Sequence, residues 1–269
     1  MEIHLVKKLS QSLEENKDVA LVTITNVHGS SPRGKGSMML VDKDGDLLEG
    51  TIGGGAVEEK AKSDAAECIK RGISKSIYYV LDQDKGSDSL QMACGGDIDI
   101  FVKVFHSSEQ LIIVGAGHIA VKLSKVAGIL GYKITIIDDR KEFATRERFP
   151  EAQEIMVGDV GENLRKCSIE EKTNIVIVTH GHNDDQIALE AVIDSKSRYI
   201  GMIGSFKKVK ESFKALEDKG FSQEKINKVH APIGIDIGGE KPEEIALSIM
   251  AEIQAVEYGK IGQIKSLYL

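Results

Sequence analysis

From residue 110 onward, short apolar runs alternate with segments of helical pattern, and this alternation constrains the fold more than any other feature. The runs are LIIVGAG, KITIIDD, EIMVGD, NIVIVTHG and YIGMIG. They lack the period of two that a half-buried strand shows, as expected for a parallel sheet covered by helices on both faces. The pattern predicts βαβ units in an α/β, Rossmann-like, doubly wound parallel sheet.

A glycine motif follows the first of these runs. Gly115 and Gly117 lie between the strand LIIV and the helix HIAVKLSKVAGILG, which begins with His118 and contains Ala120 in its first turn. The first glycine permits the tight turn, the second lets backbone approach a pyrophosphate, and the small third residue lets the helix pack closely. Gly115, Gly117, His118 and Ala120 are therefore candidate cofactor-binding residues.

Asp138 ends the next predicted strand, 21 residues after Gly117. This is the spacing of an acid that binds the ribose hydroxyls of a dinucleotide. Asp138 is therefore a further candidate cofactor-binding residue. Arg140 follows two residues later, so an NADP-like ligand is an alternative to one with an unphosphorylated ribose. The alternative is a Rossmann-like fold without a nucleotide, in which Asp138 merely ends a strand.

The residues before about 107 have a different pattern, typical of a smaller α+β domain. We expect helices at 3–16 and 57–71, strands at 19–29, 76–82 and 98–105, and a hairpin with its turn at 42–45. The sequence thus predicts an N-terminal domain over residues 1–107 and a Rossmann-like dinucleotide-binding domain over residues 108–269.

A second glycine turn, Gly53-Gly54-Gly55, precedes the second predicted helix. Helix N-termini bind anions through unpaired N–H groups. Arg33 and Lys35, in the preceding stretch VHGSSPRGKG, supply cations for the same purpose. The three glycines and Arg33 are candidate cofactor-binding residues. The alternative is a tight strand-to-helix connection without a ligand.

Three cysteines are spread along the chain without a CxxC spacing or a disulfide framework. Cys94 lies beside glycines in QMACGGD, where a thiol is accessible, and is the candidate catalytic thiol. Cys68 falls on the apolar face of a predicted helix, and Cys167 is also expected to be buried. Because free cysteines are usually buried and inert, a packing role is the alternative for Cys94.

The segment VTHGHNDDQIAL places His180, His182, Asp184 and Asp185 around a strand end, where open α/β sheets bind ligands. We include His182 and Asp185 among the candidate cofactor-binding residues. The cluster also offers metal ligands, but no further ligand set accompanies it, and His182 with Asp185 equally suits a helix start. We predict no metal site.

Charge and hydropathy argue against two classes of partner. The net charge is −7, and no basic run interleaves with aromatic residues, so we expect no nucleic-acid partner. No stretch approaches the roughly 18 apolar residues of a membrane span, and the first residues lack an apolar signal core. The expectation is a soluble, cytoplasmic protein with reduced thiols.

Together these motifs resemble the XdhC/CoxI family, accessory proteins of molybdenum hydroxylases such as xanthine dehydrogenase. The resemblance rests on GSSPRGKGSMMLV, GTIGGGAVEE, CGGDIDIF, VGAGHIA, THGHNDDQIAL, YIGMIGS and HAPIGIDIGGEKPEEIALSIMAEI. It implies that the protein binds the molybdenum cofactor (molybdopterin or its dinucleotide form), protects it during sulfuration and delivers it to an apo molybdenum hydroxylase. It also suggests a homodimer, and a cysteine desulfurase as a further partner.

Two positions depart from the family pattern. Ala56 stands where the family commonly has a cysteine after GGG, so a thiol function would fall to Cys94 or be absent. Phe206 interrupts the basic pair that follows GMIGS. An NAD(P)-dependent oxidoreductase is the alternative function, and a hydrolase using a metal at His180, His182 and Asp185 is a third. A xanthine dehydrogenase itself is excluded, because three scattered cysteines cannot hold a Cys₄ iron–sulfur cluster.

Overall fold

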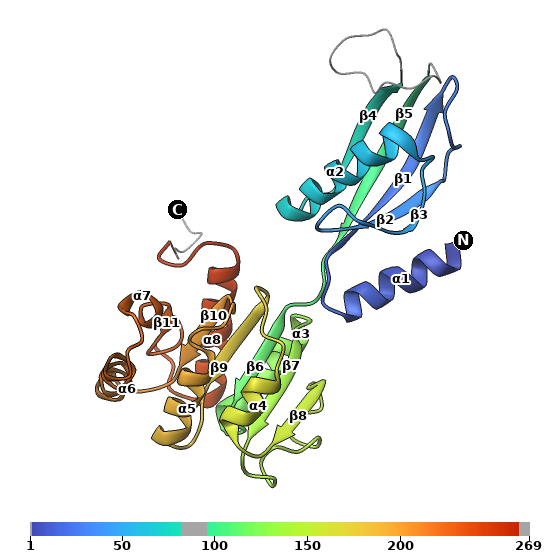
Figure 1. Ribbon diagram of the computed structural model, residues 1–269. Coiled ribbons are helices and arrows are strands. Elements are labelled where there is room, and N and C mark those ends of the chain that lie inside the picture. Colours follow the sequence, from blue (N-terminus) through green and yellow to red (C-terminus); the bar gives the residue numbers. More distant parts are fainter. Residues whose placement is uncertain (1, 82–95, 264–269) are drawn as a thin grey trace. The chain divides into compact units, whose positions relative to one another are not determined.

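The computed structural model describes residues 2–81 and 96–263. The chain divides into two compact units, Met1–Ser108 and Glu109–Leu269, and each is described by itself (Figure 1).

The first unit contains a five-stranded antiparallel sheet. Its strand order is β3-β2-β1-β5-β4, and a bulge interrupts the pairing of β1 with β5 between Ile24 and Asn26. The strands are β1 (Val19–His28), β2 (Met38–Asp42), β3 (Leu47–Gly50), β4 (Lys75–Leu81) and β5 (Gly96–Phe105).

Two helices cover opposite faces of this sheet, α1 (Glu2–Glu14) and α2 (Gly55–Arg71). The alternation of side chains along β1 explains the arrangement, because successive residues of a strand point to opposite faces. Ala20 and Val22 pack into the core under α2, whereas Val19 packs with Leu5 of α1. The first unit is therefore a three-layer α/β/α sandwich built on an antiparallel sheet.

The second unit contains a six-stranded sheet in which all strands are parallel. Its order is β11-β10-β9-β6-β7-β8. The sheet thus extends from β6 in both directions, as in the doubly wound dinucleotide-binding fold. The strands are β6 (Gln110–Val114), β7 (Lys133–Asp138), β8 (Glu154–Val157), β9 (Thr173–Ile177), β10 (Tyr199–Met202) and β11 (Val229–His230). The predicted fold class is confirmed.

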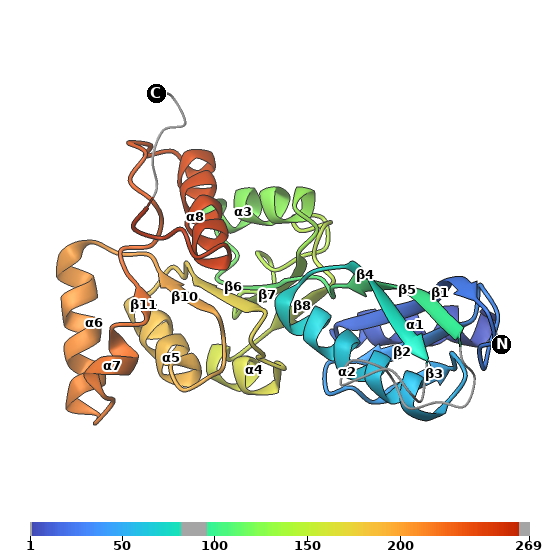
Figure 2. The same ribbon diagram turned by 90° about the horizontal axis from the view of Figure 1, so that it is seen from above.

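Helices cover both faces of the parallel sheet, as Figure 2 shows. On one face α3 (His118–Ile129) packs with α8 (Pro242–Glu257), and on the other lie α4 (Val160–Lys166), α5 (His182–Val192) and α6 (Phe206–Asp218). The short α7 (Gln223–Ile226) follows α6. Leu111 and Ile113 of β6 join the first core and Ile112 and Val114 the second, so the strand is apolar on both faces.

The connection between β7 and β8 differs from the predicted alternation, because residues 139–153 form turns and no α-helix. Its apolar residues Ala144, Phe149 and Ala152 are buried against the core under α3. Their spacing does not follow the helical period, and Pro150 lies among them. Irregular backbone therefore presents these side chains to the core.

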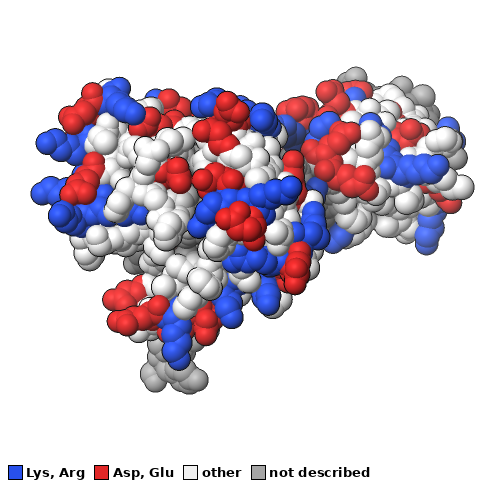
Figure 3. Space-filling model, turned by 90° about the horizontal axis from the view of Figure 1, so that it is seen from below, with Lys and Arg blue, Asp and Glu red and all other residues white. Residues whose placement is uncertain are grey.

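Acidic and basic side chains are interspersed among the described residues on the face shown in Figure 3. That face carries no extended basic area of the kind that binds nucleic acid. Within residues 2–81 and 96–263, no helix combines the length and apolar character that crossing a membrane requires.

Candidate functional site

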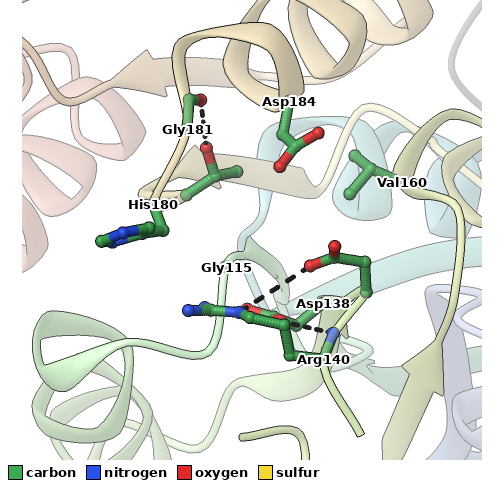
Figure 4. A pocket seen from close by; sticks show the side chains of 9 residues that line it. Gly115, Asp138, Arg140, Val160, His180, Gly181 and Asp184 are labelled. Atoms are coloured by element: carbon green, nitrogen blue, oxygen red, sulfur yellow. Dashed lines mark hydrogen bonds and ion pairs between the residues drawn. The ribbon is translucent and has the colours of Figure 1, made fainter.

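A pocket of about 140 Å³ lies at the carboxyl ends of β6, β7 and β9. The chain turns from β6 toward β7 on one side and later to β9 on the other, which makes this edge the topological switch point where doubly wound sheets bind ligands. Figure 4 shows Asp184 and Val160 across the pocket from Arg140. The lining residues are Gly115, Asp138, Asp139, Arg140, Val160, Thr179, His180, Gly181 and Asp184.

The two motif glycines have different roles. Gly115 has a φ of +105°, and a Cβ there would lie 2.4 Å from the carbonyl oxygen of Val178. Gly115 is therefore required by the close approach of the chain after β9. Gly117 has an ordinary φ of −75°, and a Cβ built on it would meet no protein atom within 4 Å. The space beside Gly117 is open to a ligand.

The helix that follows Gly117 has an N-terminus without a side-chain cap. Gly117 is the N-cap of α3, and the first turn contains no acidic residue. Ala120 is fully buried against the sheet, whereas His118 is exposed. Since the first N–H groups of a helix have no intrahelical acceptor, this turn is suited to a phosphate or carboxylate from outside the chain.

The Asp138 carboxylate is only 3% exposed and is already fully hydrogen-bonded. Oδ1 accepts from the backbone N–H and the Nε of Arg140, each at 2.9 Å. Oδ2 accepts from the N–H of Ala116 at 2.6 Å and from Nη2 of Arg140 at 2.8 Å. The structure thus uses the acceptor capacity of Asp138 within the protein, and the ribose contact that the spacing indicates stays a prediction. A ribose diol would have to displace Arg140.

These contacts determine the ionisation of Asp138. Burial raises the pKa of the carboxyl group, but the hydrogen bonds from Arg140 and Ala116 outweigh it, so the pKa lies below the ordinary value. The Arg140 guanidinium also stacks on the Phe143 ring, 4.1 Å from its centroid. Asp138 and Phe143 together hold Arg140 as a fixed, flat cation at the pocket wall.

Asp184 points into the pocket from the first turn of α5 (Figure 4). Burial raises the pKa of its carboxyl group, and the negative charges of Asp139, Asp185 and Asp138 raise it further. His180 is exposed at the pocket wall. The floor of the pocket is therefore rich in hydrogen-bond acceptors.

Asp185 has a different position from its neighbour. It is completely buried, accepts a 2.6 Å hydrogen bond from the Thr179 hydroxyl and forms an ion pair with Lys208. Asp185 therefore anchors α5 to α6, and its role as a cofactor ligand stays a prediction. His182 is exposed on α5 and does not line the pocket.

The structure does not support the alternative of a metal site at His180, His182 and Asp185. Asp185 is engaged by Thr179 and Lys208, while both histidines are exposed. In the described parts of the chain, no group of three His, Cys, Asp or Glu side chains is placed to hold a metal ion.

In the first unit, the N–H groups of Ile52, Gly53 and Gly54 at the glycine turn already have internal acceptors. Oε2 of Glu58 accepts from the N–H groups of Ile52 and Gly54, each at 3.1 Å, and also from the Thr51 hydroxyl. The N–H of Gly53 donates to the Thr51 hydroxyl oxygen at 3.0 Å. A carboxylate of the protein thus satisfies part of this turn, and the anion site there stays a prediction.

Other predicted residues lie around this turn. A Cβ on Gly53 would lie 2.5 Å from Cβ of Pro32 and 3.4 Å from Cγ of Arg33, so Arg33 passes directly beside the turn. Arg33 and Ala56 are both exposed. Cys94, the predicted catalytic thiol, lies outside the described residues.

The two described cysteines are shielded. Cys68 is buried in α2, and burial raises the pKa of its thiol. Cys167 is half-buried at the C-cap of α4, where burial raises its pKa to about 11. Since the thiolate is the reactive form, both are poor nucleophiles at neutral pH.

Comparison with known proteins identifies the family. Residues 111–253 match the XdhC Rossmann domain, which is more than half of the chain, and residues 12–80 match the XdhC and CoxI family. The chain belongs to the XdhC and CoxI family. The resemblance drawn from the motifs is confirmed.

Three relatives of this XdhC and CoxI family member are informative. It is 31% identical over 250 residues to the uncharacterised protein YqeB of Escherichia coli, covering 93% of this chain and 45% of YqeB. It is 27% identical to a probable xanthine dehydrogenase subunit of Bacillus subtilis, covering 58% and 45%. It is 24% identical to the molybdenum cofactor insertion chaperone PaoD of E. coli, covering 91% and 86%. The chain spans about half the length of the first two relatives.

A solved structure also has this fold. A protein from Bacillus halodurans, described as a xanthine dehydrogenase, aligns with a TM-score of 0.53 and 21% identity over 94% of this chain and 96% of that one. At this identity the likeness supports the arrangement of elements and carries no statement about activity.

Proposed function

We propose that this protein binds the molybdenum cofactor as cargo in the cytoplasm and takes part in maturation of a molybdenum hydroxylase of the xanthine dehydrogenase type. The named role of the relative PaoD, which matches over most of its length, supports cofactor insertion. The relative from B. subtilis, whose name assigns it to a probable xanthine dehydrogenase, supports the class of client enzyme.

The observation that carries the proposal is the open space at Gly117. The cargo has a phosphate at one end, and Gly117 combines an unobstructed Cβ direction with an uncapped helix N-terminus. The residues present therefore fit a phosphate here. Gly115, Gly117 and the first turn of α3 would hold the phosphate, while the pocket carboxylates would accept hydrogen bonds from the rest of the cargo.

Handing over the cargo requires further partners. We propose that an apo hydroxylase receives the cofactor, that a cysteine desulfurase supplies sulfur while the cofactor is bound, and that the protein acts as a homodimer. The thiol role of Cys94 in sulfuration stays a prediction from the sequence. Ala56 is exposed in the first turn of α2, so it leaves that chemistry without a cysteine at its position.

The test uses the full chain, purified from a host that makes the cofactor. Molybdenum content and the fluorescence of the oxidised pterin measure retained cargo, and transfer is measured by activation of an apo hydroxylase. Gly117→Val should lose the cargo and the transfer, because the valine side chain fills the space for the phosphate. Ser222→Val is the matched control, since Ser222 is also an N-cap in extended backbone without a side-chain cap bond, but it is exposed and does not line the pocket.

Wild type and Ser222→Val should retain equal amounts of cargo. Equal retention by Gly117→Val would contradict the assigned site. A wild-type protein that retains neither molybdenum nor pterin and activates no hydroxylase would contradict the function itself. Titration with NAD⁺ and NADP⁺, followed by nicotinamide absorbance during turnover, tests the oxidoreductase alternative in the same preparations.

A further inference from the structure

We infer that the switch-point pocket recognises the 2-amino-4-oxopyrimidine edge that pterins and guanine share. In this assignment, Asp184 accepts the two adjacent N–H donors of that edge, and the ring stacks on Arg140. The inference rests on the proposed function, because a pterin is the organic part of the molybdenum cofactor. It makes Asp184 and Arg140 the residues that determine specificity.

The distribution of charge separates two parts of the site, the pocket and the first turn of α3. Three carboxylates, Asp138, Asp139 and Asp184, line the pocket beside a single cation, Arg140. Both oxygens of Asp138 already bind that cation, whose Nε also lies 3.8 Å from Asp139. A phosphate in the pocket would face uncompensated negative charge, whereas the first turn of α3 has no acid. The phosphate therefore belongs at Gly117, and a neutral, donor-rich group belongs in the pocket.

Arg140 offers a flat surface in a fixed orientation. Two of its nitrogens donate to Asp138, and its guanidinium lies over Phe143. Its side chain keeps 28% of its surface exposed, and it contributes to the pocket wall. Planar guanidinium groups stack on flat aromatic rings. The clamped Arg140 is thus suited to a heteroaromatic ring.

The Asp184 carboxylate supplies the hydrogen-bond acceptors that recognise the ring. Its carboxylate points into the pocket and accepts no hydrogen bond from the described residues (Figure 4). Burial and neighbouring carboxylates raise the pKa of this group, so its charged form is gained at a cost that two N–H donors would offset. An ionised carboxylate only accepts, with two oxygens side by side.

That geometry discriminates between ring systems. Guanine and pterin present two neighbouring donors, a ring N–H and the 2-amino group, which match both carboxylate oxygens. Adenine presents an amino donor beside a ring-nitrogen acceptor, which would face a carboxylate oxygen lone pair. Hypoxanthine keeps the ring N–H and lacks the amino group. Sites that bind through hydrogen bonds reject analogues that leave their polar groups unpaired.

The experiment compares GMP, IMP and AMP, which share the same ribose phosphate, by calorimetric titration of the full chain. GMP should bind about tenfold more tightly than AMP, with IMP between them, the size of change expected for one or two hydrogen bonds to a charged group. Asp184→Asn should abolish the preference, because an amide offers one donor and one acceptor. Asp218→Asn, in α6 away from the pocket, is the matched control and should keep it.

Arg140→Lys keeps the charge but removes the flat surface, so it should weaken GMP and AMP alike. Equal or tighter binding of AMP, a GMP preference that survives Asp184→Asn, or absence of binding by all three nucleotides would overturn the inference. Each of these results leaves the cargo measurement on the purified protein unaffected. Failure of this inference is thereby separated from failure of the proposed function.

Discussion

The two glycine turns of this protein both begin a helix, but they differ in the acid that follows them. At Gly53-Gly54-Gly55, the side chain of Glu58 returns to the turn and accepts from the N–H groups of Ile52 and Gly54. At Gly117, the first turn of α3 has no acid and no side-chain cap. Neither helix has a side-chain cap, yet only the first has an acid in its first turn. An acid in the first helical turn therefore competes with an external anion for the donors of a glycine turn.

The strongest test of this contrast compares Gly115 with Gly117 in the second unit. Gly115→Ala should lower the free energy of unfolding by about 3 kcal/mol or more, since it combines backbone strain with a collision against Val178. Gly117→Ala should cost about 1 kcal/mol or less, because its Cβ enters open space. Chemical denaturation of both variants measures the difference. Similar losses at the two positions would remove the distinction between a packing glycine and a ligand glycine.

A smaller effect is expected at the Gly53-Gly54-Gly55 turn of the first unit. Glu58→Gln should lower the free energy of unfolding by about 2 kcal/mol, because a neutral amide oxygen accepts more weakly than a carboxylate from the N–H groups and hydroxyl that Glu58 Oε2 satisfies. Glu59→Gln is the adjacent control. Its side chain is exposed and pairs with Lys62 at the surface, so its change should stay within about 0.5 kcal/mol.

The pH dependence of the Glu58 contribution has a defined sign. Burial would raise the pKa of Glu58, but donors from Thr51, Gly54 and Ile52 bring it below the ordinary 4.5. A group with a lowered folded pKa stabilises the protein above its unfolded pKa and loses that contribution as the pH falls through the folded value. The difference in the free energy of unfolding between wild type and Glu58→Gln should thus be constant near neutral pH and should decrease below pH 4.5. A difference that increases on acidification would contradict this assignment.

The parallel sheet was predictable from sequence because burial on both faces leaves a direct signature. Continuous apolar runs such as LIIV identify strands between helices, and the observed order follows the usual doubly wound topology. The connection after β7 was harder to predict, since Phe149 and Ala152 contribute to the core without a helical period. In the first unit, the segments were recognisable, but the pairing of β1 with β5 joins strands about 80 residues apart, beyond local pattern.

The site was only partly predictable, because side-chain partners decide it. Spacing located Gly115, Gly117 and Asp138, but it could not reveal that Arg140 fills the acceptors of Asp138. Asp185 and Asp184 are adjacent in sequence, and helical geometry buries the first against Lys208 and turns the second into the pocket. In the first unit, Glu58 follows Gly54 by four residues, and this spacing was a sequence signal for an internal acceptor at the glycine turn. Read as a potential internal acceptor, it would have argued against an external anion there.

The most direct test of the central contrast follows both turns in one titration. Inorganic pyrophosphate is added to the isotope-labelled full chain, and the backbone amide resonances are recorded by NMR. We predict that amides of residues 117–120 shift in a saturable manner, while those of residues 52–54 keep their positions, because Glu58 and Thr51 already bind the latter donors. Saturable shifts at residues 52–54, with none at residues 117–120, would contradict this contrast.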